Sequence, residues 1–176
     1  YEEELEAQTD PNFQVVSIIG EAGLGKSRLL SELREVWIKT EPELSWEFSQ
    51  GIPYDMSRPY SLFQSLARGM FGVELTDAPQ LIHDKVYGAL SSMGGSEDSI
   101  SLCATAVEKI IAAKVLHEGQ YHSAEAIKND LYEVVIPAFV AAAQESPRIV
   151  IFDDLQWSDD ASMELIIHMV DFMAET

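Results

Sequence analysis

The sequence predicts an α/β domain in which helices cover both faces of a mostly parallel sheet, giving three layers, with a largely helical middle. Short apolar runs rich in β-branched residues lie near both ends of the chain, as is typical of buried parallel strands. Segments with apolar residues at helical spacing follow these runs. Strands that alternate with helices favour a parallel sheet joined by helical crossovers.

Three segments are expected to form strands. Residues 13–19 (FQVVSII) are apolar and β-branched, and they follow Asp-Pro-Asn and precede a glycine. Apolar and polar residues alternate over residues 43–50. Residues 148–152 (RIVIF) begin after Ser-Pro and end at two aspartates.

Helical spacing predicts a first helix over residues 26–39, with one apolar face that would pack on the sheet. That face consists of Leu29, Leu30, Leu33, Val36 and Trp37. Further helices are expected over residues 59–71, 80–90, 100–117, 123–144 and 159–174, with a loop at 93–96. Pro137 should interrupt the fourth of these helices, because proline lacks an amide donor and clashes one turn back. Ser158 or Asp159 is expected to cap the last one.

Composition excludes several classes of protein. The chain has 176 residues, of which 47% are apolar, so it can bury the core of one domain, assigned to residues 1–176. Its net charge of −19 argues against direct nucleic-acid binding, and its ten acidic-rich first residues carry no apolar signal segment. The longest nearly continuous apolar run, residues 134–143, is too short to span a membrane. A single cysteine, Cys103, fits a reducing compartment, so we expect a cytoplasmic protein with an inert buried thiol.

One motif carries specific chemistry. Residues 20–27 (GEAGLGKS) fit the pattern G-x-x-x-x-G-K-[ST] between an expected strand and an expected helix. This is the pattern of a phosphate-binding loop, in which glycines let successive backbone amides point at one anion. The candidate nucleotide contacts are Gly20, Glu21, Ala22, Gly23, Leu24, Gly25, Lys26, Ser27 and the adjoining Arg28, for which a surface or packing role is the alternative.

The last residues of this loop have distinct expected roles. Lys26 would reach the β- and γ-phosphates as a point charge, and it is also a candidate catalytic residue. The hydroxyl of Ser27 would be a ligand of Mg²⁺, which prefers oxygen. ATP and Mg²⁺ are therefore the expected cofactors, although no residue distinguishes adenine from guanine.

The segment from Ile149 to Asp154 (IVIFDD) is similar to a Walker B motif, a buried strand that ends in carboxylates. Asp153 would hold Mg²⁺ and Asp154 would polarise the water that attacks the γ-phosphate. Trp157, three residues further on, could anchor the core or position this loop near the nucleotide.

Three stretches together resemble the AAA-like ATPase domains of the STAND signalling P-loop NTPases, of the kind joined to nucleotidyl cyclases, protein kinases and large transcription activators. These stretches are GEAGLGKSRLL (20–30), PYSLF (59–63) and IFDDLQWSDDASMELI (151–166). The resemblance implies an ATP-dependent regulatory module that acts on neighbouring effector domains of the same polypeptide and hydrolyses ATP slowly. It also implies a further strand between the Walker B strand and the phosphate-loop strand. The chain ends one helix after Walker B, so we expect an incomplete domain with slow hydrolysis or none.

Two alternatives remain at this point. The acidic chain could be a scaffold or interaction module in which nucleotide is structural or absent. A small-molecule kinase would also use a phosphate loop, but such enzymes usually have an arginine-rich lid, and the sequence has only 11 Lys and Arg residues without such a cluster.

Overall fold

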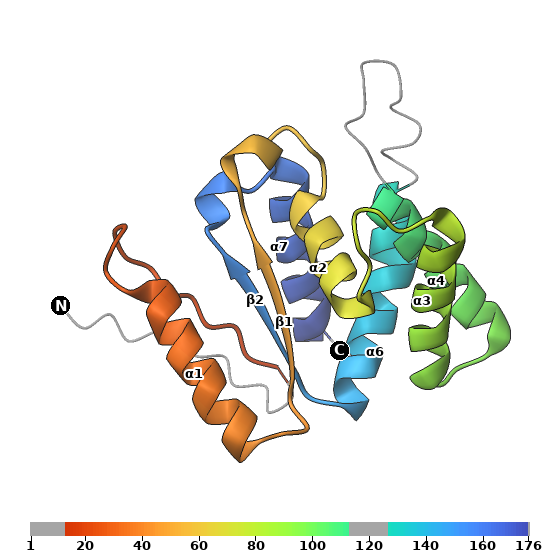
Figure 1. The fold of residues 1–176 in the computed structure, drawn as a ribbon, viewed down its shortest axis with the longest axis horizontal. Coiled ribbons are helices and arrows are strands. Elements are labelled where there is room, and N and C mark those ends of the chain that lie inside the picture. Colours follow the sequence, from red (N-terminus) through yellow and green to blue (C-terminus); the bar gives the residue numbers. More distant parts are fainter. Residues whose placement is uncertain (1–12, 113–126, 176) are drawn as a thin grey trace.

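The computed structural model describes residues 13–112 and 127–175 (Figure 1). Two strands, β1 (Ser45–Gln50) and β2 (Arg148–Asp153), pair in parallel. Their register places Ser45 opposite Arg148 and Gln50 opposite Asp153, so the carboxyl ends of both strands meet at one edge of the sheet. The strands predicted over residues 43–50 and 148–152 are confirmed.

Six helices account for most of the remaining described chain. They are α1 (Lys26–Thr40), α2 (Ser61–Phe71), α3 (Pro79–Ser92), α4 (Glu97–Ala112), α6 (Ile136–Glu145) and α7 (Asp160–Glu175). Short 3-10 helices, η1 (Pro53–Asp55) and η3 (Leu155–Trp157), follow the two strands. The helices match the predicted segments, except that parts of the helices expected over 100–117 and 123–144 fall in residues 113–126, outside the described residues.

The expected interruption near Pro137 is present. Residues 127–130 are α-helical, and the chain then forms a π-helix, η2 (Leu131–Val135), directly before α6. Proline at the second position of α6 cannot donate to the preceding turn, and its ring crowds the carbonyl one turn back. A wider turn at this point accommodates both effects.

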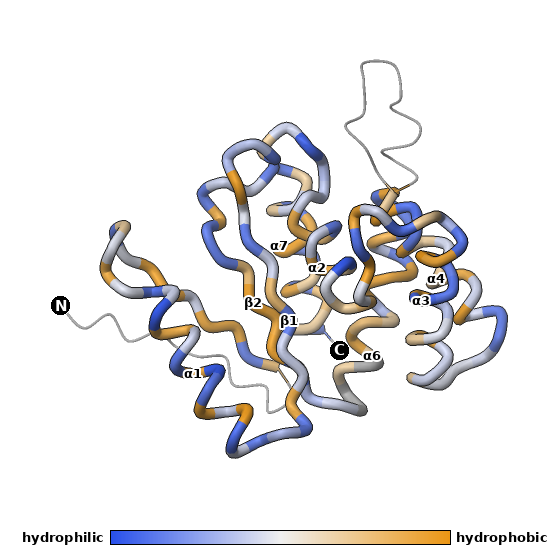
Figure 2. Tube along the Cα trace, viewed as in Figure 1, coloured by the Kyte–Doolittle hydropathy of each residue, from blue (hydrophilic) through white to orange (hydrophobic). Residues whose placement is uncertain are grey.

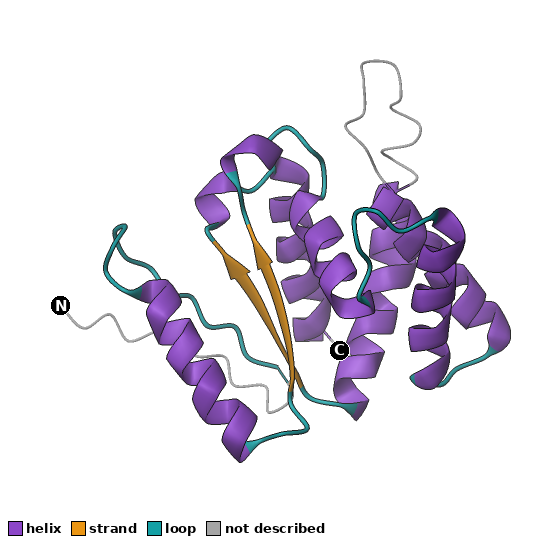
Figure 3. Ribbon diagram, in the orientation of Figure 1, coloured by secondary structure: helices purple, strands orange, loops and turns teal. Residues whose placement is uncertain are grey.

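The strand predicted over residues 13–19 is not formed. Apart from a single bridge at Phe13, residues 14–20 have no regular secondary structure, and Figure 3 shows this segment as a loop beside α1. Val16 is 78% exposed and Ile19 is 92% exposed. An apolar, β-branched composition favours a strand only where a neighbouring strand supplies the hydrogen-bonding ladder, and within the described residues β2 pairs with β1 alone.

Helix α1 lies on one side of the two strands, while α2 and α7 lie on the other (Figure 1). The predicted apolar face of α1 is not buried, because the helix contains no buried residue. Figure 2 shows apolar residues along both α1 and the preceding segment, away from the helical part of the molecule. One contact near the end of α1 is aromatic, where Trp37 meets Trp46 of β1 edge-on with 5.7 Å between ring centroids.

The core consists of two apolar clusters. The first joins the sheet to α2, α6 and α7 and includes Leu62, Leu131 and Leu165, each 1% exposed or less. The second joins α3 and α4 and includes Val86 and Cys103. Cys103 is buried as expected, and burial raises the pKa of its thiol, which favours the protonated form.

Candidate functional site

The glycine-rich loop leads directly into α1. Gly23 and Gly25 have φ angles of 84° and 88°, a left-handed conformation that glycine adopts without steric cost. No side chain caps the start of α1, and the first hydrogen bond of the helix runs from the N–H of Leu29 to the carbonyl of Gly25. The helix therefore presents its first amides toward solvent, an arrangement that suits an anion.

Lys26 folds back over this loop. Its Nζ donates hydrogen bonds to the carbonyl oxygens of Gly20, at 2.7 Å, and Glu21, at 3.1 Å. An ammonium group has three N–H donors, so two of them fix the side chain across the loop and one remains. The charge is thereby held within the curve of the glycine-rich segment.

The two motifs meet at Ser27 and Asp153. The Oγ of Ser27 donates a hydrogen bond to Oδ2 of Asp153 across a separation of 126 residues, at 3.1 Å. Asp153 is the last residue of β2 and is only 9% exposed, and its Oδ1 accepts a hydrogen bond from the N–H of Asp154 at 2.9 Å. An alcohol oxygen and a carboxylate oxygen form a donor set that suits Mg²⁺.

The carboxylate of Asp154 has different hydrogen-bond partners from that of Asp153. Its backbone has a φ of 53°, and its carboxylate accepts hydrogen bonds from Gln50 Nε2 at 2.8 Å and from Gln156 Nε2 at 3.0 Å. These two amide donors, with a smaller contribution from the charge of Lys26, lower the pKa of Asp154 below its usual value. The carboxylates of Asp153 and Asp154 therefore have different hydrogen-bond partners, although the two residues are adjacent.

A cleft of about 300 Å³ separates α1 from the sheet and ends at this site. Ser27 and Asp153 line it together with Arg34 of α1 and with Trp46 and Phe48 of β1. The cleft accounts for the exposure of α1, because it separates most of the apolar face of the helix from the strands, and Trp37 is the residue of that face that contacts β1.

The remaining candidate residues lie at the surface. Glu21, Ala22 and Leu24 are exposed on the loop. Arg28 forms an ion pair with Glu32, with 2.8 Å between Nε and Oε1, so its side chain follows the surface of α1 away from the loop. Trp157 is 40% exposed, so it does not anchor the core, and its backbone N–H donates to the carbonyl of Asp154, the residue before η3.

Sequence reasoning missed Gln50. This residue ends β1 directly opposite Asp153 and donates to Asp154. The signal was available in part, since parallel strands place their carboxyl ends at one edge and the predicted end of this strand was residue 50. The register that pairs the two ends required the structure.

A scan against protein-family models matches residues 3–173 to the AAA ATPase domain. The chain belongs to this family. No curated protein and no solved structure matches it. Membership in the AAA ATPase domain family supports nucleotide binding, and it agrees with the mixture of helices and parallel strands around a glycine-rich loop.

Within the described residues, no helix of this AAA ATPase domain is both long and apolar enough to cross a membrane. The described residues also contain no group of three His, Cys, Asp or Glu side chains that could hold a metal ion by themselves. Mg²⁺ beside a nucleotide is commonly held by one or two protein oxygens together with phosphate oxygens and water.

Proposed function

We propose that this AAA ATPase domain binds MgATP at residues 20–28 and Asp153, hydrolyses it slowly with Asp154 orienting the attacking water, and regulates neighbouring effector domains of the same polypeptide. The supporting observation is the 3.1 Å hydrogen bond between Ser27 and Asp153, because it joins the glycine-rich loop to the end of β2. The resemblance to STAND signalling NTPases supports the regulatory role and the three-layer fold of P-loop NTPases. The single cysteine, Cys103, supports a cytoplasmic location, and the chain length supports one domain over residues 1–176.

The phosphates would be held by the chain's own cations and amides. The first amides of α1 and the left-handed Gly23 and Gly25 form the curved backbone that an anion requires. Lys26 would exchange its contacts with the carbonyls of Gly20 and Glu21 for phosphate oxygens. Ser27 and Asp153 would hold Mg²⁺, which when bound neutralises charge that develops on the phosphates.

Asp154 supports slow hydrolysis. It lies next to the metal-binding Asp153, where it can orient a water toward the γ-phosphate. Its two amide donors, Gln50 and Gln156, stabilise the ionised carboxylate, and a carboxylate with a lowered pKa accepts a proton less readily. The contacts that keep Asp154 charged therefore also limit its strength as a base.

The attachment of α1 supports regulation by nucleotide. This helix has no buried residue, and a cleft of about 300 Å³ lies between it and the sheet. Its contacts with the strands include Ser27 with Asp153 and Trp37 with Trp46. A ligand that inserts between Ser27 and Asp153 would change how α1 sits on the sheet, and a neighbouring domain could sense this change.

Calorimetric titration with MgATP and with MgGTP tests nucleotide binding and the base preference. Lys26→Ala should weaken MgATP binding by roughly tenfold or more, because it removes a charge-assisted contact. Lys39→Ala is the matched control, since it removes the same charge near the other end of α1 and should leave the affinity unchanged. The absence of MgATP binding, or equal affinities for the wild type and Lys26→Ala, would refute the proposed site.

A phosphate-release assay tests hydrolysis separately. Asp154→Asn should abolish the slow turnover while MgATP affinity stays within about threefold, because Asp154 is proposed to orient water and not to bind the nucleotide. Binding without any turnover in the wild type would favour the non-hydrolysing scaffold instead.

A further inference from the structure

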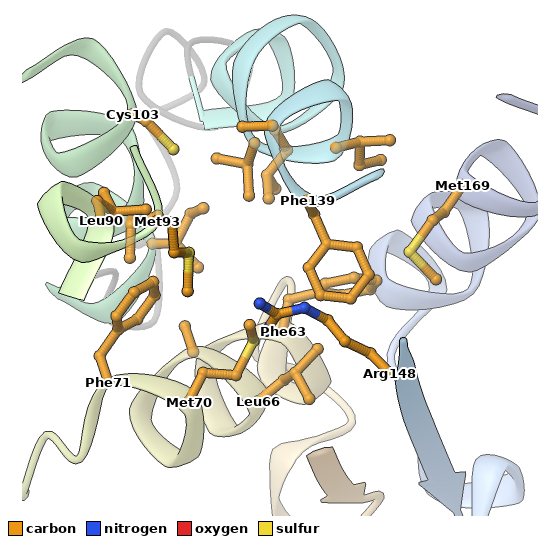
Figure 4. A pocket seen from close by; sticks show the side chains of 17 residues that line it. Phe63, Leu66, Met70, Phe71, Leu90, Met93, Cys103, Phe139, Arg148 and Met169 are labelled. Carbon is orange, nitrogen blue, oxygen red and sulfur yellow. The ribbon is translucent and has the colours of Figure 1, made fainter. Parts of the chain in front are cut away.

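A cavity of about 80 Å³ lies between the two apolar clusters of the core, on the helical side of the molecule (Figure 4). Phe63 and Leu66 of α2 form part of its wall, Val107 and Ile110 of α4 another part, and Phe139 of α6 a third. Its lining is almost entirely apolar. The sheet end that carries Asp153 does not contribute to it, so this cavity is separate from the proposed nucleotide site.

Arg148 is the one charged residue of this lining. It is the first residue of β2, and Figure 4 shows its guanidinium group reaching into the cavity beside Phe63 and Phe139. Its Nε is buried and has no hydrogen-bond partner among the described residues, and no ion pair there includes Arg148. The residue as a whole is partly buried, so the cost falls on this one N–H, because the desolvation of a buried donor without an acceptor is not offset.

We propose that this cavity binds a small amphiphilic monocarboxylate, with the carboxylate on Arg148 and a short apolar tail among the surrounding side chains. A guanidinium group binds a carboxylate with two parallel hydrogen bonds, so such a ligand would satisfy the unpaired Nε. Apolar walls with few polar groups are typical of small-molecule sites, in which the polar group fixes the orientation.

The size of the cavity limits the tail. A volume of about 80 Å³ holds a few methylene groups, which points to a short aliphatic acid and not to a long-chain fatty acid. Met70, Met93 and Met169 also line the cavity, and methionine side chains adapt their shape readily. They give the site some tolerance for different short tails.

The position of Arg148 on β2 has a further consequence. Arg148 and Asp153 are the two ends of the same six-residue strand, which places them about 16 Å apart. The acid and the nucleotide would therefore occupy opposite ends of β2 without sharing a contact residue. Binding of the acid can be tested whether or not the proposed nucleotide site is correct.

Methyl NMR with ¹³C-labelled methionine tests the proposal directly. Titration of the whole chain with sodium butanoate should shift the methyl signals of Met70, Met93 and Met169 along a saturable curve. Met56, which is 49% exposed and does not line the cavity, is the internal control and should not move. Linear, non-saturating shifts, or shifts that include Met56 equally, would overturn the proposal.

Two comparisons test the role of the charge. Butanoate should bind roughly tenfold or more tightly than 1-butanol, and Arg148→Met should remove that difference, because it keeps an unbranched side chain without the guanidinium group. Arg148→Lys keeps the charge without the paired donors and should bind butanoate with intermediate affinity. Unchanged methyl signals outside the cavity establish that each variant is folded, and an equal affinity of the wild type and Arg148→Met for butanoate would refute the role of Arg148.

Discussion

Asp159 and Ser61 lie 98 residues apart, yet Ser61 donates both its N–H, at 3.0 Å, and its hydroxyl, at 2.9 Å, to Oδ2 of Asp159. The same carboxylate accepts the N–H of Tyr60 and both the N–H and the hydroxyl of Ser162. It thereby caps α7, as expected for Ser158 or Asp159, and also fixes the start of α2. Asp159 is only 4% exposed, so one buried acid connects the two helices that cover the sheet.

Asp159→Ala should lower the free energy of unfolding by about 3 kcal/mol, because it leaves several buried donors without an acceptor. Asp159→Asn should cost less, since it retains one acceptor oxygen. Urea denaturation measures both changes. Asp160→Ala, the exposed neighbour at the start of α7, is the control and should cost less than about 1 kcal/mol. Similar losses for positions 159 and 160 would show that the buried network is not important for stability.

Position 51 requires glycine, because the backbone of another segment lies very close to it. A Cβ atom there would lie 2.5 Å from the carbonyl oxygen of Asp154 and 3.2 Å from the carbonyl carbon of Trp157. Gly51→Ala should therefore displace η3 and destabilise the fold by about 1 to 3 kcal/mol, with a loss of MgATP hydrolysis. Gly88→Ala in α3 is the matched control, because a Cβ there meets nothing within 4 Å. Gly88→Ala should raise the free energy of unfolding by about 0.5 to 1 kcal/mol. A lower free energy of unfolding in both variants would contradict the steric explanation.

Gln50 sets the ionisation of Asp154. Because its amide is the largest cause of the lowered pKa, Gln50→Leu should raise the pKa of Asp154 toward the ordinary value of 3.8. In the wild type the resulting stability is fully present above the unfolded-state pKa and is lost as the pH falls through the lower folded-state pKa. Carboxyl ¹³C NMR measures the titration. Gln80→Leu, which removes a hydrogen bond to Asp84 on α3, should leave Asp154 unchanged.

The sequence predicted the elements whose cause is local. The helical spacing of apolar residues over 26–39 predicted α1, and the apolar run over 148–152 predicted β2, because helical periodicity and β-branched composition are properties of a few neighbouring residues. The glycines of the loop were also identified, since their left-handed φ angles are a property of single positions. The hydrogen bond between Ser27 and Asp153 brings together the two residues that the motifs suggested as metal ligands, and those roles stay predictions.

Features that depend on distant partners could not be predicted in this way. Residues 13–19 have the composition of a strand, but no strand within the described residues pairs with them to extend a ladder. The register that places Gln50 beside the two aspartates, and the buried contacts of Asp159, arise from packing between segments about 100 residues apart. No local pattern predicts that the Nε of Arg148 lacks a hydrogen-bond partner either, because the surroundings of Arg148 are formed by side chains from α2, α4 and α6.

Ser27 should make nucleotide binding depend on magnesium. Its hydroxyl already contacts Asp153 at 3.1 Å, so both oxygens are placed to hold one Mg²⁺ ion. Ser27→Ala should weaken binding of MgATP by about tenfold while binding of ATP in EDTA stays unchanged, because only the metal contact is removed. Ser31→Ala, one turn further along α1, removes a hydroxyl that bonds to the carbonyl of Ser27 and should alter neither affinity. Parallel titrations with and without Mg²⁺ measure the difference, and an equal loss in both conditions would place Ser27 on the phosphates instead of on the metal.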